Sequence, residues 1–297
     1  MLRDNKCAAI VLNYNDAENA IKFSHLIESF SIIDHIIIVD NNSTDDSWSK
    51  LTKIHGEKIT CYKSPKNGGY GYGNNYGVKI AKERFNCSIG FICNSDIVVP
   101  EKCFNKIANV LLDNNKSIIC SAIQENGYTG KTIKATSWDV PSTFDYIRNS
   151  LMLLRHIIPE KRNNYRLPIQ EVDCVPGAFL GLNINCFLKC GGYDEKVFLF
   201  CEESIIGYKA KKFGYKTFLV TNQKYYHYHS TSINKSYPKE ISKYKMMIKS
   251  RKYYITNYLN VRGIKLRIVD LLLRVGVLEQ RLLSVIRLKS MKSNSKN

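Results

Sequence analysis

Three short apolar runs in the first 100 residues are each followed directly by side chains that could bind a ligand. Asn13 and Tyr14 follow the first run, the segment from Asp40 to Asp45 follows the second, and Asn94-Ser95-Asp96 follows the third. Because open α/β sheets bind ligands at the carboxyl ends of their parallel strands, we expect these side chains to meet in one crevice. Each of them could instead cap a turn or a helix, which is common for Asn, Ser and Asp.

Two adjacent acids, Glu202 and Glu203, follow an aromatic and apolar run that begins at Phe198 and precede a helical pattern that ends at Gly214. A carboxylate within hydrogen-bond reach of a substrate hydroxyl can accept its proton as a general base. The same two acids could simply stabilise the N-terminus of the helix through its dipole.

Two histidines, His227 and His229, follow a predicted strand over residues 217–220. They stand at alternate positions of an extended segment, so both side chains point to the same side. Histidine is a common metal ligand. A single histidine near a strand end is more often an ordinary core or surface residue, so the pair is a candidate metal site only in combination with a nearby carboxylate.

The elements that would position these residues alternate between strand and helix. This alternation indicates a Rossmann-like α/β fold, a doubly wound and mostly parallel sheet flanked by helices. The predicted strands cover residues 7–12, 35–39, 59–62, 89–92, 117–123 and 217–220, and the predicted helices cover residues 17–30, 46–55, a segment ending at 84, and 102–112.

Two loops rich in small residues complete the pattern. Residues 67–75 contain Asn67, Gly68 and Asn74, and their spacing matches neither a P-loop nor the first turn of a dinucleotide fold, so this stretch by itself predicts a flexible turn. Residues 175–181 include Gly177, which would let the backbone pass close to a ligand or to another chain. The segment 125–168 between them has no clear period.

The composition indicates a large globular protein. The 297 residues are 44% apolar, enough to bury a sizeable core. The sequence contains neither a run of 18 apolar residues nor a signal-peptide pattern. Ten cysteines lie mostly within apolar patterns, as reduced buried thiols do, so we expect a cytoplasmic protein. Cys186 and Cys190 approach a metal-like spacing, but no second pair accompanies them.

The C-terminal segment is strongly basic. Residues 231–297 carry sixteen Lys or Arg and three acids, a net charge of +13 out of +18 for the chain. Apolar side chains recur at helical spacing from 263 to 289, with Arg267, Asp270, Arg274 and Arg281 on an opposing stripe, which predicts a basic amphipathic helix. This helix could dock on an anionic membrane surface, pack on the rest of the chain, or join a homodimer.

The order of the motifs resembles glycosyltransferase family 2, whose members have the GT-A fold. The motifs are Asn13-Tyr14, the segment Val39 to Asp45, Asn67-Gly68-Gly69 with Asn74, and Asn94-Ser95-Asp96, and the resemblance covers about residues 7–232. It implies a nucleoside-diphosphate sugar donor whose base is bound by Asp40 and whose diphosphate carries a divalent ion, Mg²⁺ or Mn²⁺, held by Asp96. The other donor-binding residues it implies are Asn13, Tyr14, Asn42, Asn67, Gly68, Asn74 and Asn94. Asn94 replaces the first acid of the family's Asp-x-Asp motif, as in rhamnosyltransferase-like members, so Asp96 becomes the main carboxylate ligand.

The resemblance continues into the second half of the chain. Glu203 matches the acid that takes the proton from the acceptor hydroxyl, and Glu202 is the reserve candidate. Gly177 belongs to the acceptor side, and Trp138 could contact the acceptor there or form part of a packed insertion. His227, five residues before Ser232, matches a histidine that contacts metal or diphosphate, and we prefer it to His229. Ile205 replaces a later acid of the same motif, so the resemblance gives no acceptor contact at that position.

We therefore expect residues 1–232 to form a GT-A catalytic domain, with a nucleotide-sugar half of about 1–100 and an acceptor half of about 101–232, and residues 233–297 to form a basic amphipathic helical tail. The expected reaction is inverting, metal-dependent transfer of a hexosyl or deoxyhexosyl group to a saccharide or lipid-linked glycan in cell-surface polysaccharide synthesis, such as capsule or O-antigen. The expected place is the cytoplasmic face of the membrane, without nucleic acid. One rival is a nucleotidyltransferase of the same fold, which would release pyrophosphate. The other is a non-catalytic basic protein that binds membrane or nucleic acid.

Overall fold

The computed structural model describes residues 5–133, 136–159, 165–228 and 240–294. The chain divides into two compact units. Unit 1 comprises Met1–Val140, Asn163–Phe198 and Glu202–Ser232, and unit 2 comprises Pro141–Arg162, Leu199–Cys201 and Ile233–Asn297.

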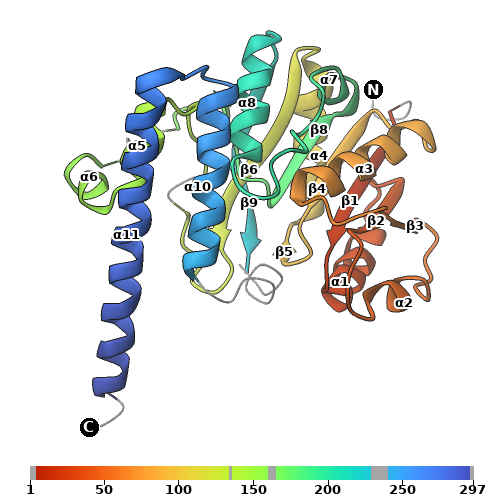
Figure 1. The fold of residues 1–297 in the computed structure, drawn as a ribbon. Coiled ribbons are helices and arrows are strands. Elements are labelled where there is room, and N and C mark those ends of the chain that lie inside the picture. The colour runs from red at the N-terminus through yellow and green to blue at the C-terminus, as the bar shows by residue number, and fades with distance from the viewer. Residues whose placement is uncertain (1–4, 134–135, 160–164, 229–239, 295–297) are drawn as a thin grey trace. The chain divides into compact units, whose positions relative to one another are not determined.

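The first half of unit 1 is a parallel sheet in the order β3-β2-β1-β4 (Figure 1). Its register pairs Asn13 with Asp40 and Val11 with Cys93, so the predicted ligand-binding side chains leave neighbouring strands at the same edge. The strands are β1 (Cys7–Asn13), β2 (His35–Asp40), β3 (Ile59–Lys63) and β4 (Ile89–Cys93), and the helices between them are α1 (Ala17–Glu28), α2 (Ser47–Leu51) and α3 (Tyr70–Glu83).

The second half extends the same sheet beyond β4. Strand β8 runs antiparallel between β4 and β6, whereas β9 runs parallel to β6. Six of the described strands therefore share one direction, and β5, β7 and β8 oppose them, which confirms a mostly parallel sheet. These elements are β5 (Ile97–Val98), α4 (Glu101–Asp113), β6 (Ser117–Asn126), β7 (Ile169–Val172), β8 (Phe179–Asn183), α7 (Ile184–Lys189), α8 (Glu202–Lys212) and β9 (Lys216–His227).

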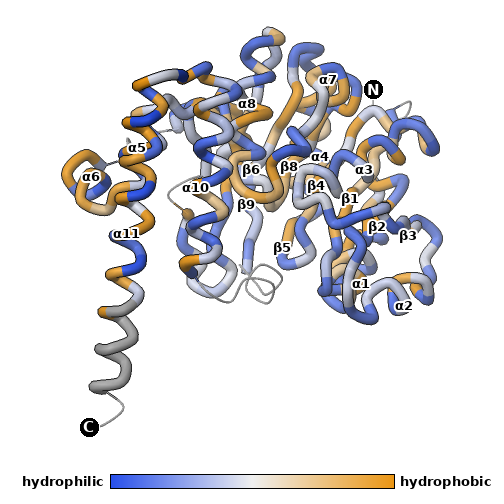
Figure 2. The backbone as a smooth tube through the Cα atoms, viewed as in Figure 1, coloured by the Kyte–Doolittle hydropathy of each residue, from blue (hydrophilic) through white to orange (hydrophobic). Residues whose placement is uncertain are grey.

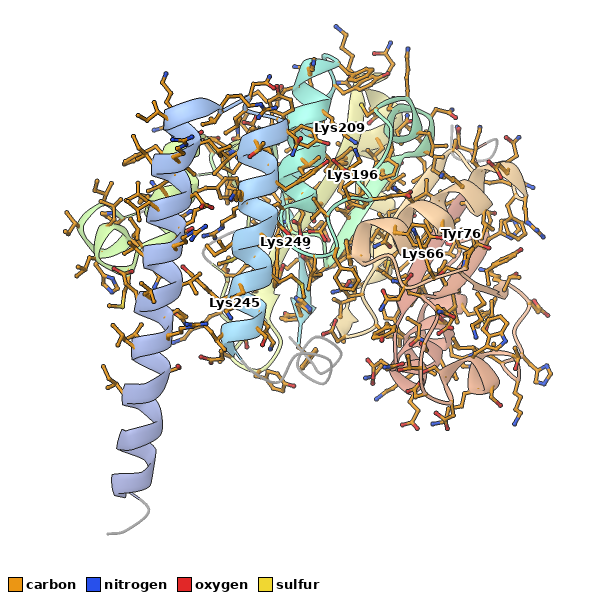
Figure 3. All side chains as sticks on the ribbon, viewed as in Figure 1. Lys66, Tyr76, Lys196, Lys209, Lys245 and Lys249 are labelled. Carbon is orange, nitrogen blue, oxygen red and sulfur yellow. The ribbon has the colours of Figure 1, made fainter. Side chains whose placement is uncertain are left out.

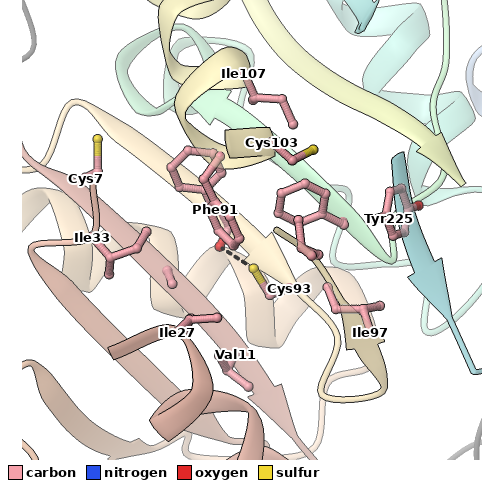
Figure 4. Packing of buried hydrophobic residues seen from close by; sticks show 14 of the residues in the cluster. Cys7, Val11, Ile27, Ile33, Phe91, Cys93, Ile97, Cys103, Ile107 and Tyr225 are labelled. Carbon is pink, nitrogen blue, oxygen red and sulfur yellow. Dashed lines mark hydrogen bonds between the residues drawn. The ribbon is translucent and has the colours of Figure 1, made fainter. Parts of the chain in front are cut away.

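Buried side chains alternate between the two faces of the sheet, as the period of a strand requires. In β1, Cys7, Ala9 and Val11 enter the core that also holds α1 and α4, whereas Ala8 and Ile10 enter the core that also holds α3, α7 and α8. Figure 4 shows the first core around Phe91, whose ring contacts Phe104 edge to face at 4.8 Å. Helices therefore cover both faces, as predicted for a doubly wound sheet.

The cysteines are all free thiols, and all except Cys61 are buried. Burial raises the pKa of the Cys103 thiol to about 12, so it stays protonated and behaves as a small apolar side chain. Buried thiols of this kind agree with the structural interpretation of the cysteine pattern.

Several predicted element boundaries are wrong. The turn expected over residues 67–75 already becomes helical at Tyr70, because Gly71 and Gly73 let α3 pack closely on Tyr193 and Leu12. Helix α2 covers only Ser47–Leu51, and β9 continues seven residues past Val220, to His227, through pairing with β6. The aperiodic segment after Glu125 contains two short helices, the first with a capping box between Ser142 and Asp145.

Unit 2 is helical. Tyr244 of α10 donates a hydrogen bond to the Ser150 carbonyl at 2.5 Å, and Gly276 of α11 packs against the same carbonyl. Figure 2 shows that apolar residues predominate on α6, whereas apolar and polar residues alternate along the coloured part of α11. Within the described residues, no helix is both long and apolar enough to cross a membrane. The helices are α5 (Thr143–Ser150), α6 (Met152–Ile157), α10 (Glu240–Asn257) and α11 (Gly263–Asn294).

Candidate active site

The ends of β1 and β2 are joined by a buried carboxylate. Asp40 is fully buried, and it accepts hydrogen bonds from Asn13 Nδ2 at 2.8 Å and from the Ser43 hydroxyl at 2.5 Å. The Ser43 amide donates to the second carboxylate oxygen at 3.1 Å. Asp40 therefore orients the loops that follow β1 and β2. Its contact with a nucleotide base stays a prediction.

Asn41 joins these loops to the start of α3. Its side-chain amide donates to Asn67 Oδ1 and to the Gly69 carbonyl, each at 3.1 Å, and its oxygen accepts from the Ser64 hydroxyl at 3.2 Å. Asn41 was not among the predicted site residues. Its only local signal was its position between two predicted site residues, because its partners lie more than 20 residues away.

The remaining predicted donor residues differ in exposure. Tyr14, Asn42 and Gly68 are half-buried at this edge of the sheet. Asn74 is fully buried in α3, where its amide donates to the Tyr70 carbonyl at 3.0 Å. In the described part of the chain, Asn74 Oδ1 has no hydrogen-bond partner. Direct binding of a ligand by any of these four residues stays a prediction.

Asp96 lies beside His227. Strand β5 pairs with β9 so that Ile97 stands opposite His227, and this register brings Asp96 Oδ1 to 3.2 Å from His227 Nε2. Both side chains are largely buried, with exposed fractions of 14% for Asp96 and 11% for His227. The structure therefore brings together the two predicted metal ligands, which are 131 residues apart in the sequence. His229 lies outside the described residues.

Two further residues orient His227. The Tyr225 hydroxyl donates to Gln124 Oε1 at 2.8 Å, and the Gln124 amide nitrogen lies 3.0 Å from His227 Nδ1. Burial raises the pKa of Tyr225 well above its ordinary value, so this hydroxyl remains a donor. Nδ1 of His227 thus faces the Gln124 side chain and Nε2 faces Asp96, and the tautomer of the ring sets which nitrogen donates.

The chemistry of this pair fits a divalent metal ion. A carboxylate oxygen and an imidazole nitrogen form a donor set suited to Mn²⁺, and one or two protein carboxylates plus substrate phosphates are also typical of Mg²⁺. Among the described residues, no cluster of three or more His, Cys, Asp or Glu side chains could hold a metal.

The acid pair begins α8. Glu203 Oε1 accepts a hydrogen bond from the Gly177 amide at 3.2 Å, and the Tyr70 hydroxyl donates to the Gly177 carbonyl at 2.6 Å. A Cβ atom at position 177 would lie 2.9 Å from that Glu203 oxygen, so glycine permits the close approach. Gly177 therefore positions Glu203 through its backbone.

The two acids differ in environment. Glu202 is 2% exposed, its Oε1 has no partner in the described structure, and burial together with the neighbouring Glu203 raises its pKa well above 4.5. Burial also raises the pKa of Glu203, whereas hydrogen bonds from its own amide and from Gly177 lower it. Glu203 is also the more exposed of the two side chains. These differences favour Glu203 as the carboxylate that ionises.

Trp138 contacts the first turn of α8, next to the acid pair. Its indole nitrogen donates to the Ser204 hydroxyl at 3.3 Å, and its backbone pairs with Cys174. The side chain is half-buried. The structure thus brings Trp138 to Ser204, the residue after Glu203, and a contact with an acceptor stays a prediction.

A backbone contact connects the segment that carries Asp96 to the loop beside the acid pair. The Asn94 amide donates to the Ala178 carbonyl at 2.9 Å, at the point where β4 and β8 end their pairing. The next residue back, Gly177, contacts Glu203. Asp96 and Glu203 therefore lie at the same edge of the sheet.

The sequence of this chain matches the family described as "Glycosyl transferase family 2" over residues 9–183, which is more than half of its length. The chain belongs to glycosyltransferase family 2. It is therefore a glycosyltransferase with a GT-A fold, and the match confirms the expected family, fold and enzyme class.

Two named relatives of this family 2 enzyme act in glycan synthesis. The chain is 23% identical over 223 residues to "Low-salt glycan biosynthesis hexosyltransferase Agl10" of Haloferax volcanii, covering 71% of this chain and 66% of the relative. It is 36% identical over 100 residues to "UDP-Glc:alpha-D-GlcNAc-diphosphoundecaprenol beta-1,3-glucosyltransferase WfaP" of Escherichia coli. That match covers 33% of this chain and 38% of WfaP. The chain thus spans less than two thirds of either relative.

A solved structure shows the same fold. The Pyrobaculum calidifontis mannosyltransferase PcManGT, determined with GDP-Man and Mn²⁺, superposes with a TM-score of 0.58 at 12% identity. The superposition covers 98% of this family 2 chain and 81% of PcManGT.

Proposed function

We propose that this enzyme is an inverting, metal-dependent transferase that moves a hexosyl or deoxyhexosyl group from a nucleoside-diphosphate sugar to a hydroxyl of a saccharide or lipid-linked glycan. The observation that carries the proposal is the shared sheet edge, where the Asp96–His227 pair and the Glu203 carboxylate are linked through Asn94, Ala178 and Gly177. A transferase of this kind needs residues that hold the donor diphosphate. It also needs, close to the transferred sugar, a general base that accepts the proton of the acceptor hydroxyl.

In the proposed mechanism, Glu203 accepts the proton of the acceptor hydroxyl while that oxygen forms its bond to the anomeric carbon. The bond from the anomeric carbon to the diphosphate oxygen breaks on the opposite face, so the configuration inverts and a nucleoside diphosphate leaves. Positive charge develops on the sugar ring, as in glycoside hydrolysis. Asp96 and His227 would hold the Mg²⁺ or Mn²⁺ ion, which would neutralise charge on the leaving diphosphate.

Asp40, Asn41 and Asn67 shape the donor side in this proposal. Their hydrogen bonds connect the ends of β1 and β2 to the glycine turn before α3. The neighbouring residues Tyr14, Asn42 and Gly68 are therefore held in fixed positions at the carboxyl ends of these strands. Gly177 and Trp138 would contact the acceptor beside Glu203. The oriented loops support a preformed site for a nucleotide sugar.

We further propose a lipid-linked acceptor in cell-surface polysaccharide assembly, at the cytoplasmic face of the membrane. The diphosphoundecaprenol acceptor in the name of WfaP supports this class of substrate. The basic tail supports attraction to anionic lipid, because residues 231–297 carry sixteen Lys or Arg against three acids.

A panel of nucleotide sugars tests the proposed reaction. The wild-type protein with Mn²⁺ or Mg²⁺ should release a nucleoside diphosphate with one member of the panel, and EDTA should abolish the release. Asp96→Ala should lower the rate about 100-fold or more, because it removes the carboxylate ligand of the ion. Release of pyrophosphate would instead identify a nucleotidyltransferase, and no release with any donor would contradict the proposal.

A further inference from the structure

Unit 2 exposes a continuous row of large apolar side chains on α11. Each of these side chains has an exposed fraction between 38% and 75%. The face that packs within unit 2 is a different one, formed by Val269, Leu273 and Gly276. We call the exposed row the apolar stripe; it consists of Ile264, Ile268, Leu271, Val275, Leu278, Leu282 and Ile286.

Arginines line one edge of the apolar stripe. Arg267, Arg274 and Arg281 recur every seven residues, so they lie on one side of the helix, and all three are exposed. Each directly precedes a member of the stripe in the sequence, which places it about 100° around the helix from that residue. The guanidinium groups therefore flank the apolar side chains.

Helix α6 borders the opposite edge. The Met152 amide donates to Glu279 Oε2 at 2.6 Å. Glu279 is four residues after Val275 and three before Leu282, so it lies beside the stripe on the edge away from the arginines. This contact holds the start of α6 next to the apolar stripe, and Figure 1 shows the two helices side by side.

Helix α6 is itself strongly apolar and exposed. Leu153 and Ile157 are 66% and 75% exposed, and no residue of α6 is buried. Arg155 and His156 of the same helix are also exposed. Two separate elements of unit 2 thus present apolar side chains beside cations, and exposed patches of this kind mark interaction surfaces.

From this arrangement we propose that α6 and the apolar stripe of α11 together form one docking surface for an anionic membrane. This inference rests on the proposed lipid-linked acceptor and adds a second insertion element, α6, to the basic tail. Apolar side chains would enter the interface while Arg155, Arg267 and Arg281 meet lipid phosphates, as in helices that lie in the plane of a membrane. Exposed lysines on α10, Lys245 and Lys249, add positive charge to the same unit (Figure 3).

The charges argue against a second copy of the chain as the occupant. A twofold interface places the same patch on itself. The acids of α11 are Asp270, which pairs with Lys252 and Arg274, and Glu279, which binds the Met152 amide, and α6 has none. A self-interface would therefore bring arginines together without free carboxylates, whereas anionic lipid supplies the missing negative charge.

Vesicle co-sedimentation of the full chain tests the proposal, using phosphatidylcholine vesicles with or without about one third phosphatidylglycerol. Wild-type protein should bind the anionic vesicles at least ten times better than the neutral ones. The double variants Leu153→Asn with Ile157→Asn, and Leu278→Asn with Leu282→Asn, should each lower the binding about tenfold or more. Asparagine removes apolar surface without adding negative charge. The matched control is Leu26→Asn with Phe213→Asn, two side chains that are each 50% exposed in unit 1, and it should bind like the wild type.

Three results would overturn the proposal. They are unchanged binding by the α6 variant, equal binding of wild type to both vesicle types, and a dimer in sedimentation velocity that the α6 and α11 variants dissociate. Release of nucleoside diphosphate without vesicles measures catalysis separately. Loss of that release with vesicle binding intact would count against the proposed function and leave the docking surface standing.

Discussion

At the scale of single residues, Glu203 and Glu202 differ in how readily they ionise. Glu203 must lose its proton to act as a base, and burial raises its pKa above 4.5. The rate of sugar transfer should therefore rise with pH through a value above 4.5. Glu203→Gln should lower kcat about 100- to 10,000-fold, because it removes the base. Glu202→Gln should retain most of the activity, because burial and the neighbouring Glu203 raise the pKa of Glu202 and the uncharged amide resembles its protonated form. Steady-state rates across pH check both variants, and an inactive Glu202→Gln with an active Glu203→Gln would reverse the assignment.

The same two carboxyl groups affect stability. Because both pKa values are raised in the folded chain, the folded state holds protons that the unfolded state has released above pH 4.5. The free energy of unfolding should therefore fall as pH rises from 4.5 through the folded pKa values. Urea unfolding of wild type and of Glu202→Gln between pH 4 and 8 should show a shallower decline in the variant. Parallel curves would mean that Glu202 ionises normally.

Gln124 would influence which nitrogen of His227 faces a metal ion in the proposed site. Metal binding through Nε2 requires Nδ1 to carry the proton, so the Gln124 side chain must turn its oxygen toward Nδ1. In Gln124→Glu, both side-chain oxygens can accept a hydrogen bond from His227 Nδ1. This variant should therefore preserve or strengthen Mn²⁺ binding. Gln124→Leu should weaken it about 10- to 100-fold. Calorimetric titration with Mn²⁺ and a nucleoside diphosphate measures this, and equal affinity in both variants would exclude a positioning role.

At the scale of elements, the glycine turn before α3 depends on its backbone. Gly69 has φ of 92°, and a Cβ atom there would lie 2.0 Å from the Phe198 carbonyl oxygen. Gly69→Ala should lower the free energy of unfolding by about 2 kcal/mol or more and disturb donor binding, because the turn must move. Gly130→Ala is the matched control, since it has φ of 63° and no neighbour within 4 Å. Urea unfolding of both variants checks the prediction. Equal losses of unfolding free energy would show that the cost comes from the positive φ angle and not from the contact with Phe198.

Sequence patterns predict the buried strands well and some element boundaries poorly. The runs at residues 35–39 and 89–92 are recognisable because, apart from His35 and Gly90, their side chains are all apolar, as in strands covered on both faces. They match β2 and β4 within one residue. The start of α3 was misplaced because its glycines have low helix propensity, which packing against Tyr193 overrides. The end of β9 was missed because pairing with β6, rather than local hydrophobicity, extends it to His227.

At the scale of the whole molecule, catalysis and membrane docking are assigned to different units and should be separable. Asp96→Asn should abolish transfer and leave vesicle binding unchanged. Leu153→Asn with Ile157→Asn should leave transfer to a water-soluble acceptor unchanged and reduce transfer to an acceptor embedded in anionic vesicles about tenfold. Assays of each variant with both acceptors check this. A unit 2 variant that loses activity on the soluble acceptor would contradict the separation.

The sequence by itself indicated the mostly parallel α/β sheet and the polar residues at the strand ends, because these follow from local periodicity. The order of its short motifs resembled glycosyltransferase family 2, and that resemblance implied the GT-A fold. The sequence also indicated the basic amphipathic tail. Only the tertiary structure decided which residues meet across long separations. The pairing of β5 with β9 brings Asp96 to His227, the fold places Gln124 and Tyr225 behind that histidine, and Gly177 meets Glu203. Such contacts depend on strand register and packing, which no local pattern records.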